Sequence, residues 1–315
     1  MTVGALAVRT VGLRRSFGDK VALDGVDLAV GTGTVFALLG PNGSGKTTTV
    51  QVLSTLVPPT SGIVEVLGHD VGREGRAVRS AIGVTGQFSA VDSLLTGREN
   101  LRLMADLQHL SPGAGRRLVD DLLETFDLVD AADTLPVVYS GGMRRRLDLA
   151  MTLVGRPRLI FLDEPTAGLD PRSRRALWHA VQGLVADGTT VFLTTQYLEE
   201  ADQLSDRIAV LEQGRVVAQG TPRELKALVP GGHLVLELAD RTTLEVAART
   251  LGIPAPPDGR LLRVPSEGTP AAVADALTRL AGAGCSPTAM SIATPDLDDV
   301  FLALTGRPDL EGSPR

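Results

Sequence analysis

GPNGSGKT, at residues 40–47, matches the pattern G-x-x-x-x-G-K-[S/T], which is typical of one class of α/β fold. An apolar run, TVFALL at 34–39, precedes it, and a run of helical character, KTTTVQVLSTL at 46–56, starts at its lysine. This pattern binds phosphate when a strand leads through it into a helix. Gly43 and Gly45 let the backbone curl so that N–H groups face phosphate oxygens, and the helix N-terminus adds its positive end. We therefore interpret the stretch as a phosphate-binding loop rather than a glycine-rich turn without a ligand.

Two side chains of this loop are expected to act on a bound nucleotide and its metal ion. Lys46 should neutralise the β- and γ-phosphates and assist catalysis, and Thr47 should ligate Mg²⁺. The residues expected to contact the nucleotide are Gly40, Pro41, Asn42, Gly43, Ser44, Gly45, Lys46, Thr47 and Thr48.

Composition indicates a globular cytoplasmic protein. The 315 residues are 43% apolar, enough for one large and one small domain. The longest apolar runs fall far short of the roughly 18 residues of a membrane span, and the N-terminal arginines follow their apolar stretch, unlike those of a secretory signal. The single cysteine, Cys285, suits a reducing compartment and is expected to be a small buried hydrophobe. A net charge of −6 without a basic block argues against nucleic acid as the main partner.

The pattern of the chain changes near residue 222. Before it, continuous apolar runs alternate with helical patterns, which predicts an α/β fold with a parallel sheet covered on both faces. Two alternating runs around Gln213 and Gly214 predict a hairpin. After residue 222, the runs HLVLEL, RLLRV and TAMSIA alternate with helical patterns, which predicts a small α+β domain with a ferredoxin-like arrangement. We therefore divide the chain into an α/β nucleotide-binding domain, 1–222, and an accessory α+β domain, 223–315.

A second motif, RLIFLDEPTAGLD at 158–170, places two adjacent acids at the end of an apolar strand. The carboxyl ends of parallel strands border the ligand crevice, so Asp163 is expected beside the phosphate loop, holding the hydration shell of Mg²⁺. Glu164 points differently and is expected to polarise the water that attacks the γ-phosphorus, a role typically worth about 10²–10⁴-fold in rate. The two acids could alternatively cap the next helix, but their combination with Lys46 favours the catalytic interpretation.

A third motif, YSGGMRRRLDLAMTLV at 139–154, starts with a good N-cap residue and continues with an apolar stripe at helical spacing. Ser140, Gly141 and Gly142 therefore form a second helix terminus that can bind an anion. Alone, the motif could be no more than a capped helix. Its position shortly before the FLDE strand favours a role at the nucleotide.

The set and order of these motifs resemble the nucleotide-binding subunits of ATP-binding cassette (ABC) transporters, from residue 6 to about residue 222. The resemblance implies a P-loop NTPase domain with a helical subdomain at about 88–154, and ATP and Mg²⁺ as ligands. It also implies an ATP-dependent, head-to-tail homodimer. In that dimer Ser140, Gly141 and Gly142 of one subunit touch the γ-phosphate held by the phosphate loop of the other.

The resemblance gives roles to three further residues that would otherwise be ordinary loop or core positions. Gln87, in GVTGQFS, matches the glutamine that senses Mg²⁺ and the γ-phosphate and links to the membrane partner. Phe17, in RSFGDK, matches the aromatic residue that stacks on adenine. Asp170, in AGLD, matches the loop that crosses the dimer interface.

Four segments are more closely similar to the daunorubicin-resistance type of exporter ATPase: TGQFSAVDSLLTGRENL, SGGMRRRLDLAM, LTTQYLEEADQL and PDLDDVFLALTG. That likeness implies a separately encoded membrane permease of the ABC-2 type, a peripheral location at the cytoplasmic face of the membrane, and export of an antibiotic or another amphiphile. A soluble ABC ATPase that acts on ribosomes or DNA is the alternative, disfavoured because the chain has one phosphate loop and no sustained heptads. A P-loop kinase or GTPase would leave the SGG helix terminus unexplained.

Three residues depart from the general family pattern: Tyr139 stands where leucine is usual, Met143 where glutamine is usual, and Gln196 where histidine is usual. Gln196 bears on the chemistry. Its carboxamide offers two donors and one acceptor, so we expect it to donate to the γ-phosphate and accept from the attacking water. Because it cannot gain a proton near neutral pH, hydrolysis should be slower without being abolished. Alternatively, Gln196 only satisfies backbone groups at the strand end.

Overall fold

The computed structural model describes residues 5–86, 90–229, 232–256, 259–266, 269–293 and 296–305. These residues form two compact units that divide between Pro222 and Arg223. Each unit contains a hydrophobic core of its own. Among the described helices, none is long and apolar enough to cross a lipid bilayer.

The first unit is built on a six-stranded sheet. Its strands are β3 (Val35–Leu39), β6 (Ile82–Thr85), β7 (Leu159–Asp163), β8 (Thr190–Thr195), β9 (Arg207–Glu212) and β10 (Arg215–Gly220). Their order is β10-β9-β3-β8-β7-β6, and all neighbours are parallel except β9 and β10. Every residue of β3, β7 and β8 is buried, as expected of parallel strands covered on both faces. This order places the carboxyl ends of β3, β7 and β8 next to one another.

The predicted hairpin is confirmed. Strands β9 and β10 pair antiparallel, and Gln213 and Gly214 connect them. The backbone φ is +47° at Gln213 and +77° at Gly214. Two successive positive φ values are typical of the type I′ turn, whose twist matches that of the flanking strands.

A second, antiparallel sheet packs against helix α1 in the same unit. Its strands are β1 (Leu6–Phe17), β2 (Lys20–Gly31), β4 (Ser61–Val66) and β5 (His69–Asp70), in the order β2-β1-β4-β5. Helix α1 (Lys46–Leu53) contacts β2 and β4 as well as β7 and β8, so it lies between the two sheets. Val8, Val52 and Phe161 show this continuity, since they come from β1, α1 and β7 and belong to one buried cluster.

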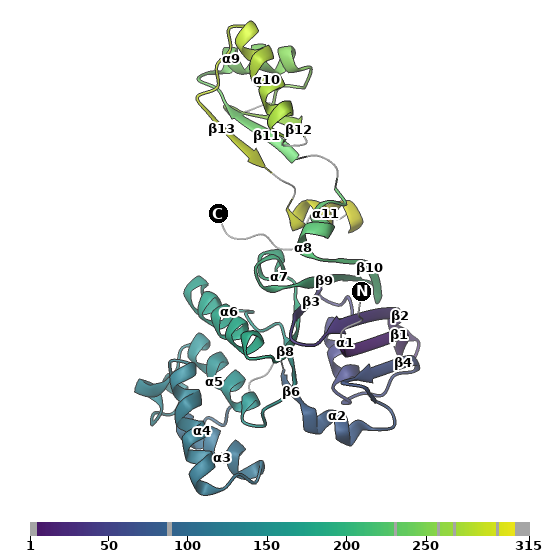
Figure 1. Ribbon diagram of the computed structural model, residues 1–315, viewed down its shortest axis with the longest axis vertical. Coiled ribbons are helices and arrows are strands. Elements are labelled where there is room, and N and C mark those ends of the chain that lie inside the picture. The colour runs from purple at the N-terminus through teal and green to yellow at the C-terminus, as the bar shows by residue number, and fades with distance from the viewer. Residues whose placement is uncertain are drawn as a thin grey trace. The chain divides into compact units, whose positions relative to one another are not determined.

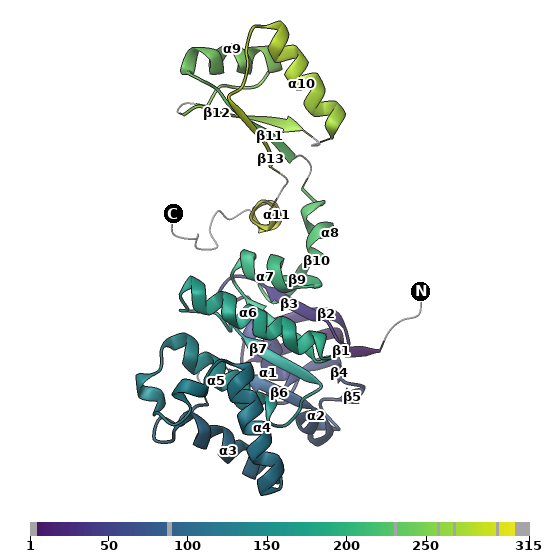
Figure 2. The same cartoon turned by 60° about the vertical axis from the view of Figure 1, so that its left-hand side comes forward.

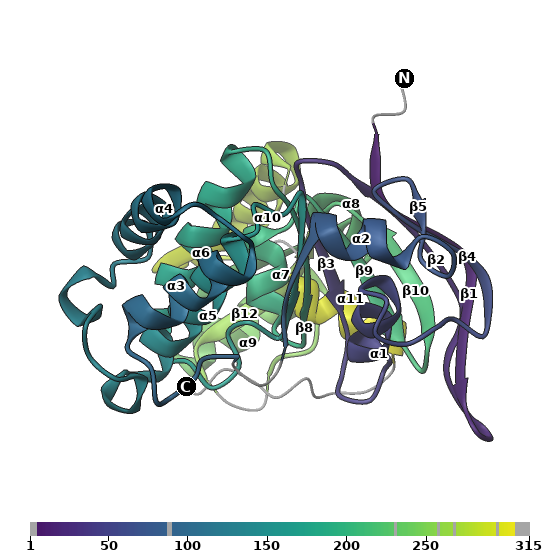
Figure 3. The ribbon, with the colours of Figure 1, turned by 90° about the horizontal axis from the view of Figure 1, so that it is seen from below.

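Residues 97–153 contain helices and their connections, and no described residue in this range belongs to a strand. The helices are α3 (Gly97–Leu107), α4 (Pro112–Thr125) and α5 (Gly141–Leu153), with 3₁₀ turns η1 (Val129–Ala131) and η2 (Pro136–Val138). Thr96, Ser111 and Ser140 cap the three helices through their side-chain oxygens. Figures 1 and 3 show these helices on the side of the central strands opposite the antiparallel sheet.

Three further helices connect the strands of the six-stranded sheet. These are α2 (Gly75–Ala81) before β6, α6 (Pro171–Ala186) after β7, and α7 (Leu198–Leu204) after β8. Because each follows or precedes a parallel strand, the chain has the alternating organisation that the apolar runs predict.

The second unit is a three-stranded antiparallel sheet covered by two helices (Figure 2). Its elements are β11 (Gly232–Glu237), α9 (Arg241–Leu251), β12 (Leu261–Ser266), α10 (Pro270–Gly282), β13 (Ala289–Ala293) and α11 (Leu297–Thr305); α8 (Pro222–Lys226) stands at the division. Leu234 and Leu236 of β11 pack with Leu262 of β12 and with residues of α9 and α10. Cys285 belongs to this core, as predicted.

Among its described residues, this unit has one strand fewer than the ferredoxin-like arrangement that we expected. The described elements run β-α-β-α-β-α, whereas a ferredoxin-like fold runs β-α-β-β-α-β. The segment between α9 and β12 contains Pro254 and Pro256 and forms no strand in its described residues. Proline lacks the N–H group that a sheet ladder needs, which accounts for the difference.

Candidate active site

The phosphate loop follows β3 and leads into α1, as its sequence context predicts. Gly40 donates its N–H to Thr195 O at 3.2 Å, and Gly214 donates its N–H to Ser44 O at 2.9 Å, so neighbouring strands hold the loop at both ends. Gly40 has no room for a side chain, because an added Cβ would lie 2.2 Å from Leu211 O. Gly45 has a φ of +113°, which favours glycine. The sequence pattern indicates backbone freedom at Gly43 and Gly45, whereas the close approach of Leu211 O to Gly40 arises from tertiary packing.

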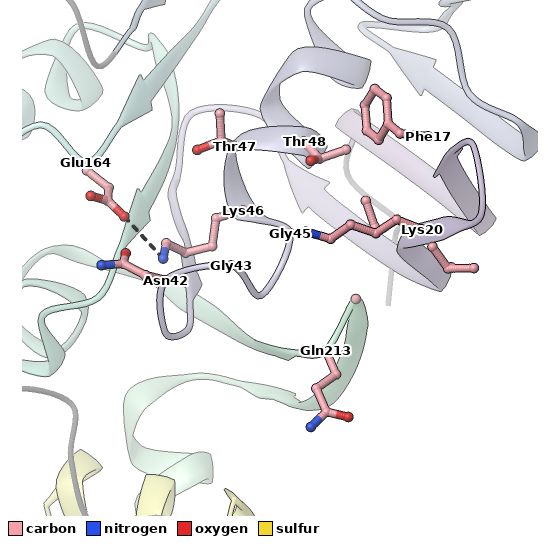
Figure 4. Close-up of a pocket in the computed structure, with 13 residues that line it drawn as sticks. Phe17, Lys20, Asn42, Gly43, Gly45, Lys46, Thr47, Thr48, Glu164 and Gln213 are labelled. Carbon is pink, nitrogen blue, oxygen red and sulfur yellow. Dashed lines mark ion pairs between the residues drawn. The ribbon is translucent and has the colours of Figure 1, made fainter.

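Lys46 points into the centre of the loop. Its ammonium donates to Gly40 O at 2.8 Å and to Pro41 O at 3.1 Å. It also forms an ion pair with Glu164 Oε1 at 3.2 Å, drawn as the dashed line in Figure 4. Only 4% of the Lys46 side chain and 12% of the Glu164 side chain are exposed. The structure therefore brings together two of the predicted catalytic residues, which are far apart in sequence.

Asp163 and Glu164 leave β7 in different directions. Asp163 is buried, and its Oδ1 accepts a hydrogen bond from Thr194 Oγ1 at 2.5 Å. Glu164 has a φ of +48°, and its N–H donates to Thr194 O and to Thr194 Oγ1, both at 3.1 Å. This left-handed turn directs the Glu164 carboxylate to Lys46. Neither acid caps a helix, because Asp170 is the N-cap of α6, so the alternative interpretation of the motif as a helix cap is wrong.

A cavity of about 650 Å³ extends from the phosphate loop to the end of β1. Phe17, at that end, is 45% exposed and lines the cavity together with Thr47 and Thr48 (Figure 4). The guanidinium of Arg15 stacks on the Phe17 ring, 4.3 Å from its centroid. Such a position leaves one face of the ring for a ligand. Glu164 and Lys46 also line this cavity. The Phe17 ring therefore lies at one end of the cavity and the Lys46–Glu164 ion pair at the other.

Five residues of the cavity lining were not predicted as site residues: Lys20, Val21, Ala22, Gln213 and Gly214. Lys20 follows the β1–β2 turn, and Gln213 lies in the β9–β10 hairpin turn. The hairpin was predicted from its sequence. Its position beside the phosphate loop was not, because the hydrogen bonds of Gly214 to Ser44 and Asp24 join segments distant in sequence.

The SGG terminus borders a second cavity, of about 400 Å³, that also contains Glu164. Ser140 caps α5 by accepting a hydrogen bond from Met143 N at 3.1 Å. Gly141 lines the cavity. Gly142 packs against α6, where an added Cβ would lie 2.3 Å from Ser173 Oγ. The capped terminus and the candidate base therefore share one hollow within a single chain.

Asp170 is fully engaged as a helix cap. It accepts hydrogen bonds from Arg172 N and Ser173 N, each at 3.0 Å, and from Ser173 Oγ at 2.6 Å. The bond from the Ser173 hydroxyl is the main cause that holds the pKa of Asp170 below its usual value. The loop that the resemblance assigns to a dimer interface is therefore anchored to α6 through Asp170.

Tyr139, a departure from the family pattern, has a specific setting. Its hydroxyl donates to Ala131 O at 2.6 Å, and burial raises its pKa. The ring lies against Gly97, where an added Cβ would be 2.3 Å from the hydroxyl oxygen. Because Gly97, on α3, has no side chain, there is room for the Tyr139 ring before α5.

Neither of the two glutamines predicted for the site is in the described lining of these cavities. Gln87 lies outside the described residues. Gln196 directly follows β8 and is half-buried, and it is absent from the described lining of both cavities. The predicted chemistry of both glutamines therefore stays a prediction.

Comparison with known proteins agrees with this geometry. The family model described as ABC transporter matches residues 23–167. The daunorubicin resistance ATP-binding protein DrrA3 of Streptomyces coeruleorubidus is 50% identical, covering 95% of this chain and 96% of the relative. The Nod factor export ATP-binding protein I of Rhizobium meliloti is 37% identical, covering 97% and 90% of the two chains.

Solved structures show the same fold in the nucleotide-binding part. The structure of an ATP-binding subunit of an ABC transporter has a TM-score of 0.64 and 28% identity, covering 70% of this chain and 92% of that one. A dimeric, post-hydrolysis ATP-binding cassette bound to ADP and Pi has a TM-score of 0.62 and 27% identity, covering 68% and 98%. The chain therefore belongs to the ABC transporter family, as an ATP-binding subunit that hydrolyses ATP.

Proposed function

We propose that this ATPase energises efflux of an antibiotic or another amphiphile through a separate membrane permease of the ABC-2 type. The observation that supports the catalytic part is the Lys46–Glu164 pair, 3.2 Å apart, which joins the phosphate loop to an acid at the end of β7. The near full-length likeness to daunorubicin resistance ATP-binding proteins supports the class of cargo.

The described residues fit Mg-ATP. The cavity of about 650 Å³ falls within the range of about 300–1,000 Å³ of small-molecule sites. The Ser44 hydroxyl, in the phosphate loop, is buried and has no hydrogen-bond partner among the described residues. A phosphate oxygen would give it one. Mg²⁺ keeps several waters and needs only one or two protein ligands, so Thr47 and Asp163, with Gln87 outside the described residues, would hold it. The bound ion would neutralise charge on the β- and γ-phosphates.

The reaction assigns a separate task to each charged residue. Lys46 binds the β- and γ-phosphates, which compete with Glu164 for its ammonium. Glu164, released from the ion pair, accepts the proton of the water that attacks the γ-phosphorus. Asp163 stays fixed by the Thr194 hydroxyl. The ion pair therefore keeps the base at the phosphate site before the nucleotide arrives.

The remaining site residues bind and orient ATP. Phe17 stacks on the adenine, with Arg15 covering the other face of its ring. Ser140, Gly141 and Gly142 contact the γ-phosphate held by a second subunit in an ATP-dependent homodimer. The dimeric solved cassette bound to ADP and Pi supports this part of the proposal.

The proposal places the subunit at the cytoplasmic face of the membrane as a peripheral partner of the permease. An ABC ATPase acting on ribosomes or DNA is the competing function. Co-purification with a polytopic membrane protein supports export, and co-sedimentation with ribosomes supports the alternative.

Transport into inverted membrane vesicles tests the function directly. Vesicles that contain the permease and the wild-type chain should take up daunorubicin when ATP is added. Vesicles with Lys46→Ala, which removes the only cationic side chain of residues 40–47, should not. Equal uptake by the two, with ATP consumed in neither, would contradict the proposal.

A further inference from the structure

Arg145, on α5, is a mostly buried cation that borders the second cavity and has no role in the proposed reaction. Its side chain is 12% exposed, and burial lowers its pKa. A buried guanidinium is retained only where its donors are satisfied. The partners of Arg145 are therefore informative.

The guanidinium donates to three backbone carbonyls from two segments. Its Nε donates to Pro165 O at 3.0 Å, and its Nη2 donates to Asp163 O at 3.1 Å. Its Nη1 donates to Gly86 O at 2.9 Å. Asp163 and Pro165 are the immediate neighbours of Glu164, so Arg145 holds a carbonyl on each side of that residue.

The charge of Arg145 is balanced by an acid on the same helix. Asp148 is 3% exposed, and its Oδ2 lies 3.3 Å from Arg145 Nη1. Its other oxygen accepts a hydrogen bond from Ala90 N at 2.9 Å. The remaining N–H groups of the guanidinium bind the three carbonyls. The single ammonium group of a lysine could not reach all three, because its donors come from one nitrogen.

The peptide groups around Glu164 are therefore held from two sides. Thr194 accepts the N–H of Glu164, and Arg145 binds the carbonyls before and after it. Glu164 itself has a φ of +48°, a conformation that persists only where the surroundings enforce it. We infer that Arg145 is a positioning residue that fixes the turn which aims the Glu164 carboxylate at the phosphate site. This inference rests on the proposed role of Glu164 as the base.

Steady-state ATP hydrolysis of matched variants tests the inference. Arg145→Gln removes the fork of donors, and it is combined with Asp148→Asn so that no unpaired charge is buried. The double variant should turn over at least about tenfold more slowly than Asp148→Asn alone, while its KM for ATP stays within about threefold. The split is expected because Arg145 contacts the segment of Glu164 and no part of the phosphate loop.

Two further variants keep the test interpretable. Arg146→Gln, the neighbouring arginine, loses only an ion pair to Asp127, whose side chain is 93% exposed, so it should keep wild-type turnover. Arg145→Lys keeps a positive charge beside Asp148, which protects the fold, and should still lose most of the turnover. Circular dichroism and thermal unfolding establish that each variant is folded.

Three results would overturn the inference. The first is wild-type turnover in both folded Arg145 variants. The second is an equal loss of ATP affinity and turnover, which would indicate a general structural role. The third is full turnover of Glu164→Gln, which would overturn the proposed base together with the inference. Loss of turnover in Glu164→Gln beside normal Arg145 variants would overturn the inference alone.

Discussion

Glu164 adopts a backbone conformation that residues with a Cβ rarely take, with a φ of +48°. Such a conformation costs about 1–3 kcal/mol, and here the hydrogen bonds of its N–H to Thr194 offset part of that cost. The turn sets the direction of the Glu164 side chain. The carboxylate leaves the direction of β7 and meets Lys46 at 3.2 Å, while Asp163 stays buried against Thr194.

Glu164→Gln should separate ATP binding from hydrolysis. The amide cannot accept the proton of the attacking water, but the phosphate loop and the SGG terminus are unchanged. We expect ATP affinity within a few-fold of wild type, loss of turnover of at least about 10²-fold, and a stable ATP-bound dimer. Size-exclusion chromatography with ATP measures the dimer. A variant that stays monomeric at saturating ATP, while wild type dimerises with a non-hydrolysable analogue, would contradict the expectation.

Gln196 allows a test of the chemistry expected from its carboxamide. We predict that Gln196→Ala lowers kcat by about tenfold or more with little change in ATP affinity. Gln196→His should keep or raise turnover and introduce a pH dependence between about pH 6 and 8, because imidazole titrates there. Steady-state turnover of the three proteins with the permease present is the measurement. An alanine variant as fast as wild type would show that Gln196 takes no part in the reaction.

Helix α3 contacts the segment before α5, and this contact makes room for Tyr139, which stands where the family usually has leucine. Tyr139 replaces the usual leucine, and its hydroxyl needs both an acceptor and space. Ala131 O supplies the acceptor, and the absent side chain of Gly97 supplies the space. The two residues therefore form one packing unit, although Gly97 begins one helix and Tyr139 precedes another.

Gly97→Ala should destabilise the fold by about 1–3 kcal/mol through overpacking, although alanine is the better helix former. The added Cβ would lie 2.3 Å from the Tyr139 hydroxyl. Combining it with Tyr139→Phe removes that oxygen and should restore part of the loss. Urea unfolding of the single and double variants measures the coupling.

Gly113→Ala is the matched control in α4, because its added Cβ would meet only Arg117 Nη1, at 4.0 Å. It should be neutral or stabilising by up to about 1 kcal/mol. Equal destabilisation by Gly97→Ala and Gly113→Ala would refute the packing argument.

At the scale of the whole molecule, the chain divides into two compact units with separate cores. The phosphate loop, Glu164, Phe17 and the SGG terminus all belong to the first unit. The second unit carries no phosphate-binding pattern in its sequence. We propose that residues 223–315 act in assembly, by supporting the dimer or the contact with the permease.

Truncation after Pro222 tests this assignment. The shortened chain should bind ATP within a few-fold of wild type, because no described residue that lines the nucleotide cavity lies beyond Pro222. It should recover less permease on co-purification and transport less cargo. Calorimetric titration of ATP and recovery of the membrane partner are measured on the same preparation. Loss of nucleotide binding in a shortened chain that remains folded would show that the boundary or the role is wrong.

The class of fold follows from the amino-acid sequence, which also predicts the residues of the nucleotide site. The phosphate loop, the acids after an apolar strand and the capped SGG helix are local patterns, because glycine conformation, strand burial and helix capping depend on adjacent residues. The β9–β10 hairpin was predictable for the same reason. The number of strands described in the second unit was not, since a run interrupted by proline cannot complete a sheet ladder.

The contacts between residues far apart in the chain follow only from tertiary packing. Lys46, at the start of α1, pairs with Glu164, directly after β7. Gly40 must be glycine because Leu211 O lies where a Cβ would be, and Tyr139 fits because Gly97 lacks a side chain. In the sequence, Arg145 is one of several arginines on a predicted helix. Its three backbone carbonyl partners are evident only in the structure. These contacts join residues far apart in the chain, so they depend on how sheets and helices pack, which no local pattern records.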